Sequence, residues 1–405
     1  MKIVCIGGGP AGLYFTILMK LQDQRHDITI LERNAPGYTY GWGVTIWDHL
    51  METLRRCDAE SARMIRDSVK SWSGQVVEIQ GRKALETGEY GGYSLSRQCL
   101  LDILTKRARE LGVRIEYERE VSSLSDLPEC DLIVASDGVN SRLRELAAVE
   151  FATDVHVERN KYLWLGTDKV FDSFTYAFVK TEPGWIWCYA YGVDSSSSTS
   201  TFIIGCPPEV WSGLGFGAMS VAETLSALEE VFKSQLDGHR LLGKFRDDAA
   251  APWMNFRTVT NKNWHAGKIV LMGDAAHTTH FTIGSGTKLA MEDAVTLASK
   301  LREQGEIQGA LRAYTKERQA ALRLPQRDAR VSAQWFENVS SYLELKPDQF
   351  SILLLKRWSF LLQYLPPRLY LWLLTATEEN AVLRALRRQI WPRVRAFYRR
   401  SMAAS

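Results

Sequence analysis

The sequence predicts an α/β fold in which a Rossmann-like nucleotide-binding sheet is interrupted by an inserted antiparallel β-sheet and followed by a C-terminal helical tail. Three observations support this prediction. The chain opens with a short apolar run, a glycine-rich turn and a helical segment, as Rossmann-like folds do. Two later apolar runs, residues 130–137 and 267–274, end in an aspartate next to a glycine. Residues 156–260 instead alternate apolar and polar side chains, which is typical of antiparallel strands.

Length and composition agree with a globular, two-domain protein. The chain has 405 residues, of which 45% are hydrophobic. Its six cysteines show no metal-ligand spacing, so no metal is expected, and this cysteine usage indicates a reducing, cytoplasmic compartment. The net charge of +3 is uneven, because residues 381–405 contain seven arginines and no acid. An excess of basic over acidic residues that is confined to one end of the sequence does not indicate a nucleic-acid partner.

The first glycine turn has the G-x-G-x-x-G spacing in Gly7, Gly9 and Gly12. Gly7 permits a tight turn, Gly9 lets a pyrophosphate approach the backbone, and Gly12 lets the helix pack on the strand. The helix begins near Pro10 and Ala11, so its first N–H groups face the phosphates.

A second apolar run, "DITILER", ends in Glu32, about 20 residues further along, where a ribose-binding acid is expected. Arg33 is predicted to lie near the adenosine, with a solvated side chain as the alternative.

A second strand end and a second glycine loop lie far along the chain. Asp274 follows a buried strand, and Gly284 and Gly286 precede a helix that starts near Thr287. Asp137 ends the other late strand in the same way. Acids at the carboxyl ends of parallel strands face the ligand crevice, and a helix N-terminus there favours anions. A ligand that binds at both glycine loops must be long enough to reach from one to the other, which predicts FAD.

These motifs together resemble the single-component FAD-dependent aromatic monooxygenases, the class of p-hydroxybenzoate hydroxylase. The family pattern D-G-x-x-S-x-x-R is matched by Asp137, Gly138, Ser141 and Arg144, and G-D-A-A-H by residues 273–277. Over roughly residues 1–350 the chain is similar to the subgroup with anthraniloyl-CoA monooxygenase, salicylyl-CoA 5-hydroxylase and the tryptophan hydroxylase of violacein biosynthesis. The resemblance implies that Arg97 contacts the cofactor. Gly43 and Val121 complete the predicted cofactor-binding set.

The resemblance also implies the chemistry. NADH or NADPH would reduce the flavin transiently, O2 would form a flavin C4a-hydroperoxide, and one oxygen atom would pass to the substrate by hydroxylation or epoxidation. The expected substrate is an aryl-CoA thioester, an indole or a prenylated indole. Three alternatives remain open: a prenyl-lipid reductase on the same fold, a flavin-dependent halogenase, and a non-catalytic prenyl-binding escort protein. A yellow protein with substrate-stimulated O2 uptake would separate the monooxygenase from the reductase and the escort.

The chain departs from the family pattern after G-D-A-A-H. Where prolines are usual it has His280 and Phe281, and the usual asparagine is Lys288. Because His280 lies in the loop expected to face the flavin, and histidine titrates near neutrality, it is the predicted acid–base residue. The alternative is a hydrogen-bonded loop histidine. With Phe281, the side chains expected to line the substrate pocket, unless they only pack the core, are Trp185, Trp187, Tyr189 and Tyr191.

The domain boundaries follow from these segments. The predicted FAD-binding domain comprises residues 1–73, 95–155 and 262–330, the substrate domain 74–94 and 156–261, and the C-terminal helices 331–405. The tail is apolar from residue 351, but Lys356, Arg357 and two prolines interrupt it, so it is not a transmembrane span. Its arginine-rich end predicts either peripheral contact with an anionic membrane, a mouth for a lipophilic substrate, or a helical pair packed on the protein.

Overall fold

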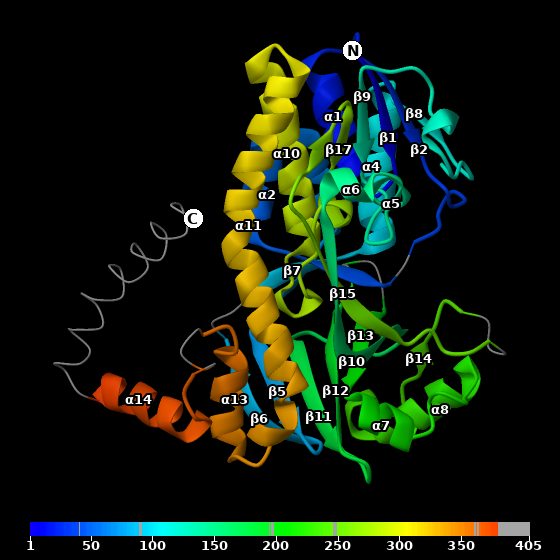
Figure 1. Ribbon diagram of the computed structural model, residues 1–405. Coiled ribbons are helices and arrows are strands. Elements are labelled where there is room, and N and C mark those ends of the chain that lie inside the picture. The colour runs from blue at the N-terminus through cyan, green and yellow to red at the C-terminus, as the bar shows by residue number, and fades with distance from the viewer. Residues whose placement is uncertain are drawn as a thin grey trace.

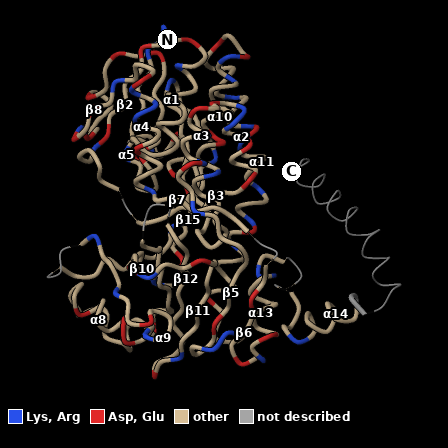
Figure 2. Tube along the Cα trace, turned by 180° about the vertical axis from the view of Figure 1, so that it is seen from behind, with Lys and Arg blue, Asp and Glu red and all other residues tan. Residues whose placement is uncertain are grey.

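The computed structural model describes residues 1–39, 41–88, 91–193, 195, 198–245, 249–359, 362 and 364–379. The protein has a mixed α/β fold with a six-stranded and an eight-stranded sheet, and one long helix, α11 (Ile307–Glu337), runs beside both (Figure 1). Acidic and basic residues are interspersed over the described chain (Figure 2). No helix among these residues is long and apolar enough to cross a membrane.

The six-stranded sheet contains the four strands that the sequence motifs predicted and two short edge strands that they did not. Its order is β16 (His265–Ala266), β17 (Ile269–Leu271), β9 (Leu132–Ala135), β1 (Lys2–Ile6), β2 (Asp27–Leu31) and β8 (Arg114–Glu116). All pairs are parallel except β16–β17, and the inner strands β1, β9 and β17 are almost wholly apolar because both their faces are buried. The associated helices are α1 (Pro10–Gln22), α4 (Arg97–Glu110), α5 (Arg142–Leu146), α6 (Ala148–Phe151) and α10 (Gly286–Gln304). The carboxyl ends of β1, β2, β9 and β17 therefore share one edge.

A small sheet lies between the two large ones. It consists of β3 (Gly43–Ile46), β7 (Gly92–Ser96) and β4 (Lys70–Trp72), and helices α2 (Asp48–Cys57) and α3 (Ala59–Ser68) connect β3 to β4. Single turns of 3₁₀-helix occur at η1 (Leu124–Asp126), η2 (Gly273–Ala275) and η3 (Phe281–Ile283).

The eight-stranded sheet has the order β14 (Leu241–Leu242), β10 (Thr153–Thr167), β13 (Ser200–Cys206), β12 (Trp185–Gly192), β11 (Phe174–Lys180), β5 (Gln75–Ile79) and β6 (Arg82–Thr87), and β15 (Met254–Asn261) also pairs with β10. The expectation of a purely antiparallel insertion is wrong at one place, since β5 and β11 are parallel. Both strands begin at the same end of the sheet, where the Phe174 N–H donates to the Gly74 carbonyl, and they therefore run in the same direction.

Both faces of the eight-stranded sheet are covered. Helices α7 (Pro208–Gly213), α8 (Val221–Val231) and α9 (Lys233–Leu236) pack on one face, and α11, α12 (Val339–Tyr342) and α13 (Pro347–Leu355) on the other. Trp187 stacks on Phe336 of α11, and Phe178 meets Phe350 of α13 edge-on. The predicted boundary at residue 330 falls inside α11, because one continuous helix with Pro325 in its interior packs against both layers.

The C-terminal segment divides into two parts. Phe350, Leu353 and Leu354 of α13 are fully buried, so the interpretation of the tail as ordinary packing holds for this helix. Helix α14 (Pro367–Glu379) follows, and it keeps Leu369 and Trp372 exposed. The arginine-rich stretch 381–405, on which the membrane hypothesis depends most, lies outside the described residues.

Candidate active site

The three glycines of the first loop differ in their surroundings. Gly7 has φ +101°, and a Cβ there would lie 2.4 Å from the Ser136 carbonyl oxygen. A Cβ on Gly12 would lie 2.4 Å from the Gly7 carbonyl oxygen, so the helix could not pack as closely on the strand. Gly9 has open space, since its Cβ would meet only one atom, at 4.0 Å. No described side chain caps α1 at Gly9, so its first amides are open to an anion.

Glu32 lies at the end of β2, beside the glycine turn. Its Oε2 accepts a hydrogen bond from the Gly8 N–H at 2.7 Å, and its Oε1 accepts from the backbone N–H and side-chain amide of Asn34 at 2.8 and 2.7 Å. These bonds fix the carboxylate where an adenosine ribose is expected. Sequence reasoning missed Asn34. Arg33 is exposed, whereas Val121 is buried in the core.

Asp274 and Arg97 are far apart in the sequence but close enough in the fold for their charges to interact. The Asp274 side chain is accessible, yet enough protein surrounds it that burial raises its pKa, while the positive charges of Arg97 and Arg144 oppose that shift. Arg97 Nε donates to Thr39 Oγ1 at 3.0 Å, and desolvation lowers the Arg97 pKa. Asp274 therefore lies solvent-accessible at the end of β17, within reach of the charges of Arg97 and Arg144.

The second glycine loop presents another open helix end. Gly284 has φ +60°, and its carbonyl accepts hydrogen bonds from Thr45 Oγ1 at 3.2 Å and Trp47 Nε1 at 2.9 Å. A Cβ on Gly286 would meet nothing within 4 Å, and no described side chain caps α10 at Ser285. The loop is therefore anchored by the small sheet, and the N-terminus of α10 is available to a ligand.

The D-G-x-x-S-x-x-R motif connects the two late strand ends. Ser141 Oγ accepts from the Arg144 N–H and caps α5, and Arg144 Nη1 donates to the Ala275 carbonyl at 3.0 Å. One Asp137 oxygen accepts from the Arg142 N–H at 2.7 Å, whereas its Oδ1 is buried without a partner among the described residues.

These features fit FAD. Two helix N-termini without side-chain caps, each next to a glycine with free space, lie at the carboxyl edge of the parallel sheet. Asp274 and the unpartnered Asp137 oxygen offer acceptors for ligand hydroxyls. The N–H of Gly43, a residue of the predicted cofactor-binding set, donates to Thr201 Oγ1, and its carbonyl accepts from the Tyr191 hydroxyl. Gly43 therefore anchors the small sheet on the eight-stranded sheet.

A buried ionic network supports the Gly273–Asp274 turn from behind. Asp293 of α10 accepts from His277 Nε2 at 2.8 Å, from the Gly273 N–H at 3.0 Å, and from Arg318 Nε of α11 at 2.6 Å. Burial alone would raise the pKa of Asp293, but its interactions with His277 and Arg318 lower it. Sequence reasoning missed Asp293, although an acid on the largely apolar face of an amphipathic helix was a usable signal.

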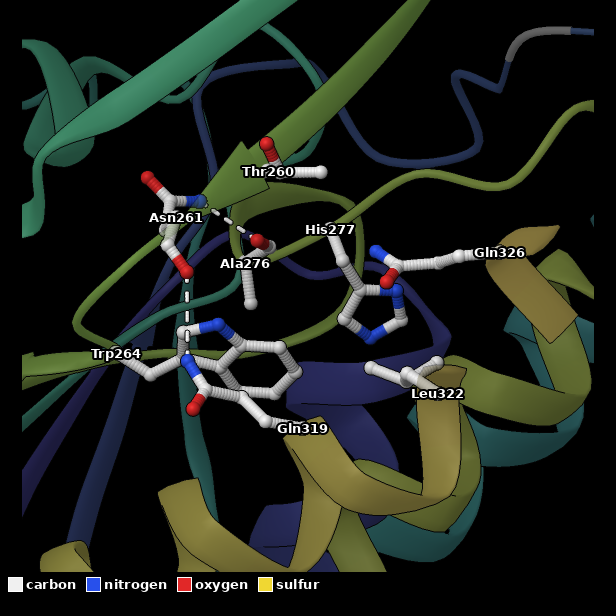
Figure 3. A pocket seen from close by; sticks show the side chains of 8 residues that line it. All are labelled: Thr260, Asn261, Trp264, Ala276, His277, Gln319, Leu322 and Gln326. Carbon is white, nitrogen blue, oxygen red and sulfur yellow. Dashed lines mark hydrogen bonds between the residues drawn. The ribbon is translucent and has the colours of Figure 1, made fainter. Parts of the chain in front are cut away.

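His277 Nδ1 has no partner among the described residues and borders a cavity of about 190 Å³ (Figure 3). The cavity is lined by Thr260, Asn261, Trp264, Ala276, His277, Gln319, Leu322 and Gln326. None of these belongs to the predicted cofactor set, and ligand pockets are usually ~300 Å³ or larger. His277 therefore has a structural role behind the turn.

His280 is buried among aromatic rings. Its Nδ1 lies 2.9 Å from Thr282 Oγ1, and its ring stacks on Phe281 and contacts Tyr162 and Phe256. Burial, aided by the charge of Arg357, lowers the pKa of His280 to about 3. The expected near-neutral pKa is therefore wrong, because the desolvation was not visible in the sequence, and His280 stays neutral at pH 7.

The low pKa of His280 predicts acid sensitivity. The unfolded chain binds a proton at this histidine below about pH 6.5, whereas the folded protein does not until about pH 3, so stability falls as the pH drops through this window. At pH 5 the loss is about 2 kcal/mol. In urea unfolding between pH 7 and 4.5, His280→Phe is expected to show a shallower pH dependence by about one proton. An unchanged slope would contradict the low pKa.

The predicted pocket aromatics do not form one group. Tyr189 and Phe281 meet edge-on near His280, with ring centroids 5.6 Å apart. Trp187 donates through Nε1 to the Tyr189 hydroxyl and packs against α11. Tyr191 bonds to Gly43, and Trp185 is only partly buried at the start of β12.

Replacing Asp274 with alanine is expected to weaken FAD binding. Charged hydrogen bonds to hydroxyls contribute about 1–3 kcal/mol, which corresponds to a loss of roughly 5- to 150-fold in affinity. FAD content after gel filtration and titration of the FAD-free protein measure this, with the exposed Asp67→Asn as control. Full occupancy and unchanged affinity would remove Asp274 from the cofactor site.

Comparison with known proteins agrees with this geometry. Residues 1–324 match the family described as FAD binding domain. The chain is 36% identical to a salicyloyl-CoA 5-hydroxylase of a Streptomyces species over 88% of this chain and 70% of that protein. It is 33% identical to a 3-hydroxy-4-methyl-anthranilyl-[aryl-carrier protein] 5-monooxygenase of Streptosporangium sibiricum, over 83% of this chain and 89% of that protein. It is 30% identical to protodeoxyviolaceinate monooxygenase of Chromobacterium violaceum, over 86% and 92% respectively.

A solved structure shares the fold at low identity. The oxygenase of 2-methyl-3-hydroxypyridine-5-carboxylic acid superposes with a TM-score of 0.63 at 20% identity, covering 84% of this chain and 91% of that one. The glycine loops, the strand-end acids and these similarities lead to one conclusion: the chain belongs to the FAD binding domain family, among its flavin-dependent aromatic monooxygenases.

Proposed function

We propose that this protein inserts one oxygen atom from O2 into the aromatic part of a lipophilic substrate, with NADH or NADPH as reductant. The observation that supports this most is the pair of open helix N-termini and strand-end acids beside a buried aromatic cluster. FAD, when bound, supplies the oxygen activation. The chain's own side chains bind and orient the reactants and exclude water.

In this proposal each layer has its own task. Residues 1–73, 95–155 and 262–330 hold FAD: Gly9 and the start of α1 bind the pyrophosphate, Glu32 the ribose, and Asp274 the ribityl hydroxyls. Gly286, Thr287 and the start of α10 bind the flavin edge. Residues 74–94 and 156–261, with Phe281, form the apolar wall for the substrate, to which Tyr189 contributes. Because α11 packs on both layers, the helical tail supports this wall from behind.

The substrate class is proposed from the relatives and the aromatic wall. One relative is named for a salicyloyl-CoA thioester, one for an anthranilyl carrier-protein thioester, and one for protodeoxyviolaceinate. Aryl thioesters, indoles and prenylated indoles are therefore the compounds to test. All of them carry a flat, electron-rich ring that suits an apolar, aromatic-lined pocket.

Oxygen uptake tests this function. The protein with bound FAD is mixed with NADH or NADPH and a panel of salicyl-CoA, indole and a prenylated indole. We expect one compound to stimulate both reductant and O2 consumption, and the product to carry one 18O from labelled O2. A flavin-free protein would favour the escort alternative, substrate reduction without O2 the reductase, and chloride-dependent halogenated product the halogenase. Any of these outcomes would contradict the proposal.

We also propose a peripheral membrane contact for this otherwise cytoplasmic protein. Tyr364 and Trp372 are 68% and 63% exposed, Leu369 is exposed beside them, and the sequence continues into the seven arginines of residues 381–405. Exposed aromatics next to arginines are typical of interfacial segments on anionic lipid.

The protein is therefore expected to co-sediment with phosphatidylglycerol vesicles at low salt and to be released by high salt. Leu369→Ser with Trp372→Ser should weaken the binding, whereas Val149→Ser, an equally conspicuous exposed apolar residue elsewhere, should not. A protein that stays in the supernatant at low salt excludes the membrane contact. Truncation at residue 345 is unsuitable, since it removes the core side chains of α13.

A further inference from the structure

A chain of hydrogen bonds joins the C-terminal segment to His280. Arg357 follows α13, and its Nε donates to Ser332 Oγ of α11 at 3.0 Å. The Ser332 hydroxyl lies 2.8 Å from Thr282 Oγ1, which lies 2.9 Å from His280 Nδ1. All four side chains are buried, so solvent does not compete for these bonds.

The positive charge of Arg357, at the start of this series of hydrogen bonds, has no negative partner among the described residues. No carboxylate of the described residues pairs with Arg357, whose other N–H groups donate to the carbonyls of Leu354 and Thr282, at 2.8 and 2.7 Å, and to the Tyr176 hydroxyl. All of these acceptors are neutral. A guanidinium is always protonated and only donates, so Ser332 Oγ is an acceptor of the Arg357 N–H.

The direction of these hydrogen bonds determines which ring nitrogen of His280 carries the proton. The Thr282 backbone N–H donates to His280 Nδ1 at 3.4 Å, so this nitrogen is an acceptor. The Thr282 hydroxyl therefore donates to Nδ1 and accepts from the Ser332 hydroxyl, which in turn accepts from Arg357 Nε. In a neutral imidazole with an accepting Nδ1, the proton is on Nε2.

The Nε2–H group is left without a partner. It is buried, and none of the described residues accepts a hydrogen bond from it. Its neighbours are the rings of Tyr162, Phe256 and Phe281. A buried donor without an acceptor destabilises the ligand-free protein, so a ligand that brings an acceptor to this place is favoured.

We propose that His280 is a specificity-determining residue whose Nε2–H binds an oxygen acceptor of the substrate, a carbonyl or phenol oxygen on the aromatic ring system. Arg357 is a positioning residue that holds His280 in this tautomer through Ser332 and Thr282. The inference rests on the proposed function for the presence of an aromatic substrate. It adds that a substrate with a suitably placed oxygen is preferred over the same ring system without one.

Nitrogen-15 spectroscopy of the FAD-loaded protein with labelled histidine tests the tautomer without any turnover. The His280 signals, assigned by their loss in His280→Phe, should show a protonated Nε2 and an unprotonated Nδ1 from pH 8 to pH 5. Thr282→Val, which keeps the shape but removes the hydroxyl, should mix the tautomers, and so should Arg357→Met. Arg368→Met, an exposed arginine of the same segment, should change nothing. A protonated Nδ1 in the wild type would overturn the proposal.

A pair of probes tests the acceptor. Indole-3-carbaldehyde carries a carbonyl oxygen, and 3-ethylindole has a similar size without one. The aldehyde should shift the Nε2–H resonance and bind roughly tenfold tighter than the hydrocarbon, a preference lost in His280→Phe and reduced in Thr282→Val. No shift at saturating aldehyde, or equal affinities, would overturn the donor role. The proposed function is judged separately by O2 uptake, and circular dichroism with FAD content verifies each variant's fold.

Discussion

Replacing Asp293 with asparagine is expected to lower the free energy of unfolding by about 3–5 kcal/mol, because the substitution leaves Arg318 buried without its main counter-charge. Asparagine has nearly the same shape, so little of this loss comes from packing. Asp293 is fully buried and holds His277, Arg318 and the Gly273 N–H at once. Urea unfolding of the FAD-free protein measures the effect. The exposed Asp67→Asn should change stability by less than about 0.5 kcal/mol.

The same network gives a pH dependence of known sign. Since the pKa of Asp293 is lower in the folded protein than in the unfolded chain, its stabilisation is present above about pH 4 and is lost as the pH falls through the folded pKa. The Asp293→Asn variant should therefore lose less stability than the wild type at the most acidic pH values. A variant as stable as the wild type at pH 7 would show that the ion pairs only offset the desolvation of their charges.

Two alanine substitutions in the first loop are expected to have opposite consequences. Gly9 has φ −76°, which alanine adopts easily, and its Cβ would have free space, so Gly9→Ala should leave the FAD-free protein as stable as before. It should weaken FAD binding more than tenfold, because the methyl group would occupy the approach of the pyrophosphate. Gly12→Ala should destabilise the FAD-free protein by about 1–3 kcal/mol, because its Cβ would collide with the Gly7 carbonyl and Ser136 Oγ.

Urea unfolding without FAD and fluorescence titration with FAD separate these two effects. Normal FAD affinity in Gly9→Ala would mean that no phosphate approaches this glycine. Unchanged stability in Gly12→Ala would mean that β1 and α1 have room to move apart.

Local chemistry explains what the sequence could predict. The glycine loops and the strand-end acids follow patterns that are local in the sequence, so their spacing revealed them. The partners of Asp293 and of Arg357 could not be predicted in this way. Arg357 reaches Ser332, Thr282 and Tyr176, which are 25, 75 and 181 positions away along the chain.

The errors have a similar origin. The near-neutral pKa expected for His280 was that of an unperturbed histidine, and only the packing of three aromatic rings and a buried cation around it reveals the desolvation. The parallel pairing of β5 with β11 joins two separate insertions, each of which reads as antiparallel on its own. Apolar patterning also does not show that α11, which contains the predicted domain boundary at residue 330, packs against two cores.

That shared helix sets how the two layers can move. Arg318 ties α11 to the flavin side through Asp293, Ser332 ties it to the substrate side through Thr282, and Pro325 lies midway between them. A proline has no N–H to donate, so the helix is least stiff near this turn. If the two layers rock relative to each other, α11 would bend mainly near Pro325, because Arg318 and Ser332 fix the helix to one layer each on either side of it. A change in the stiffness of this one turn would alter how firmly the two layers keep their relative position at the active site, although no residue that contacts a ligand is changed.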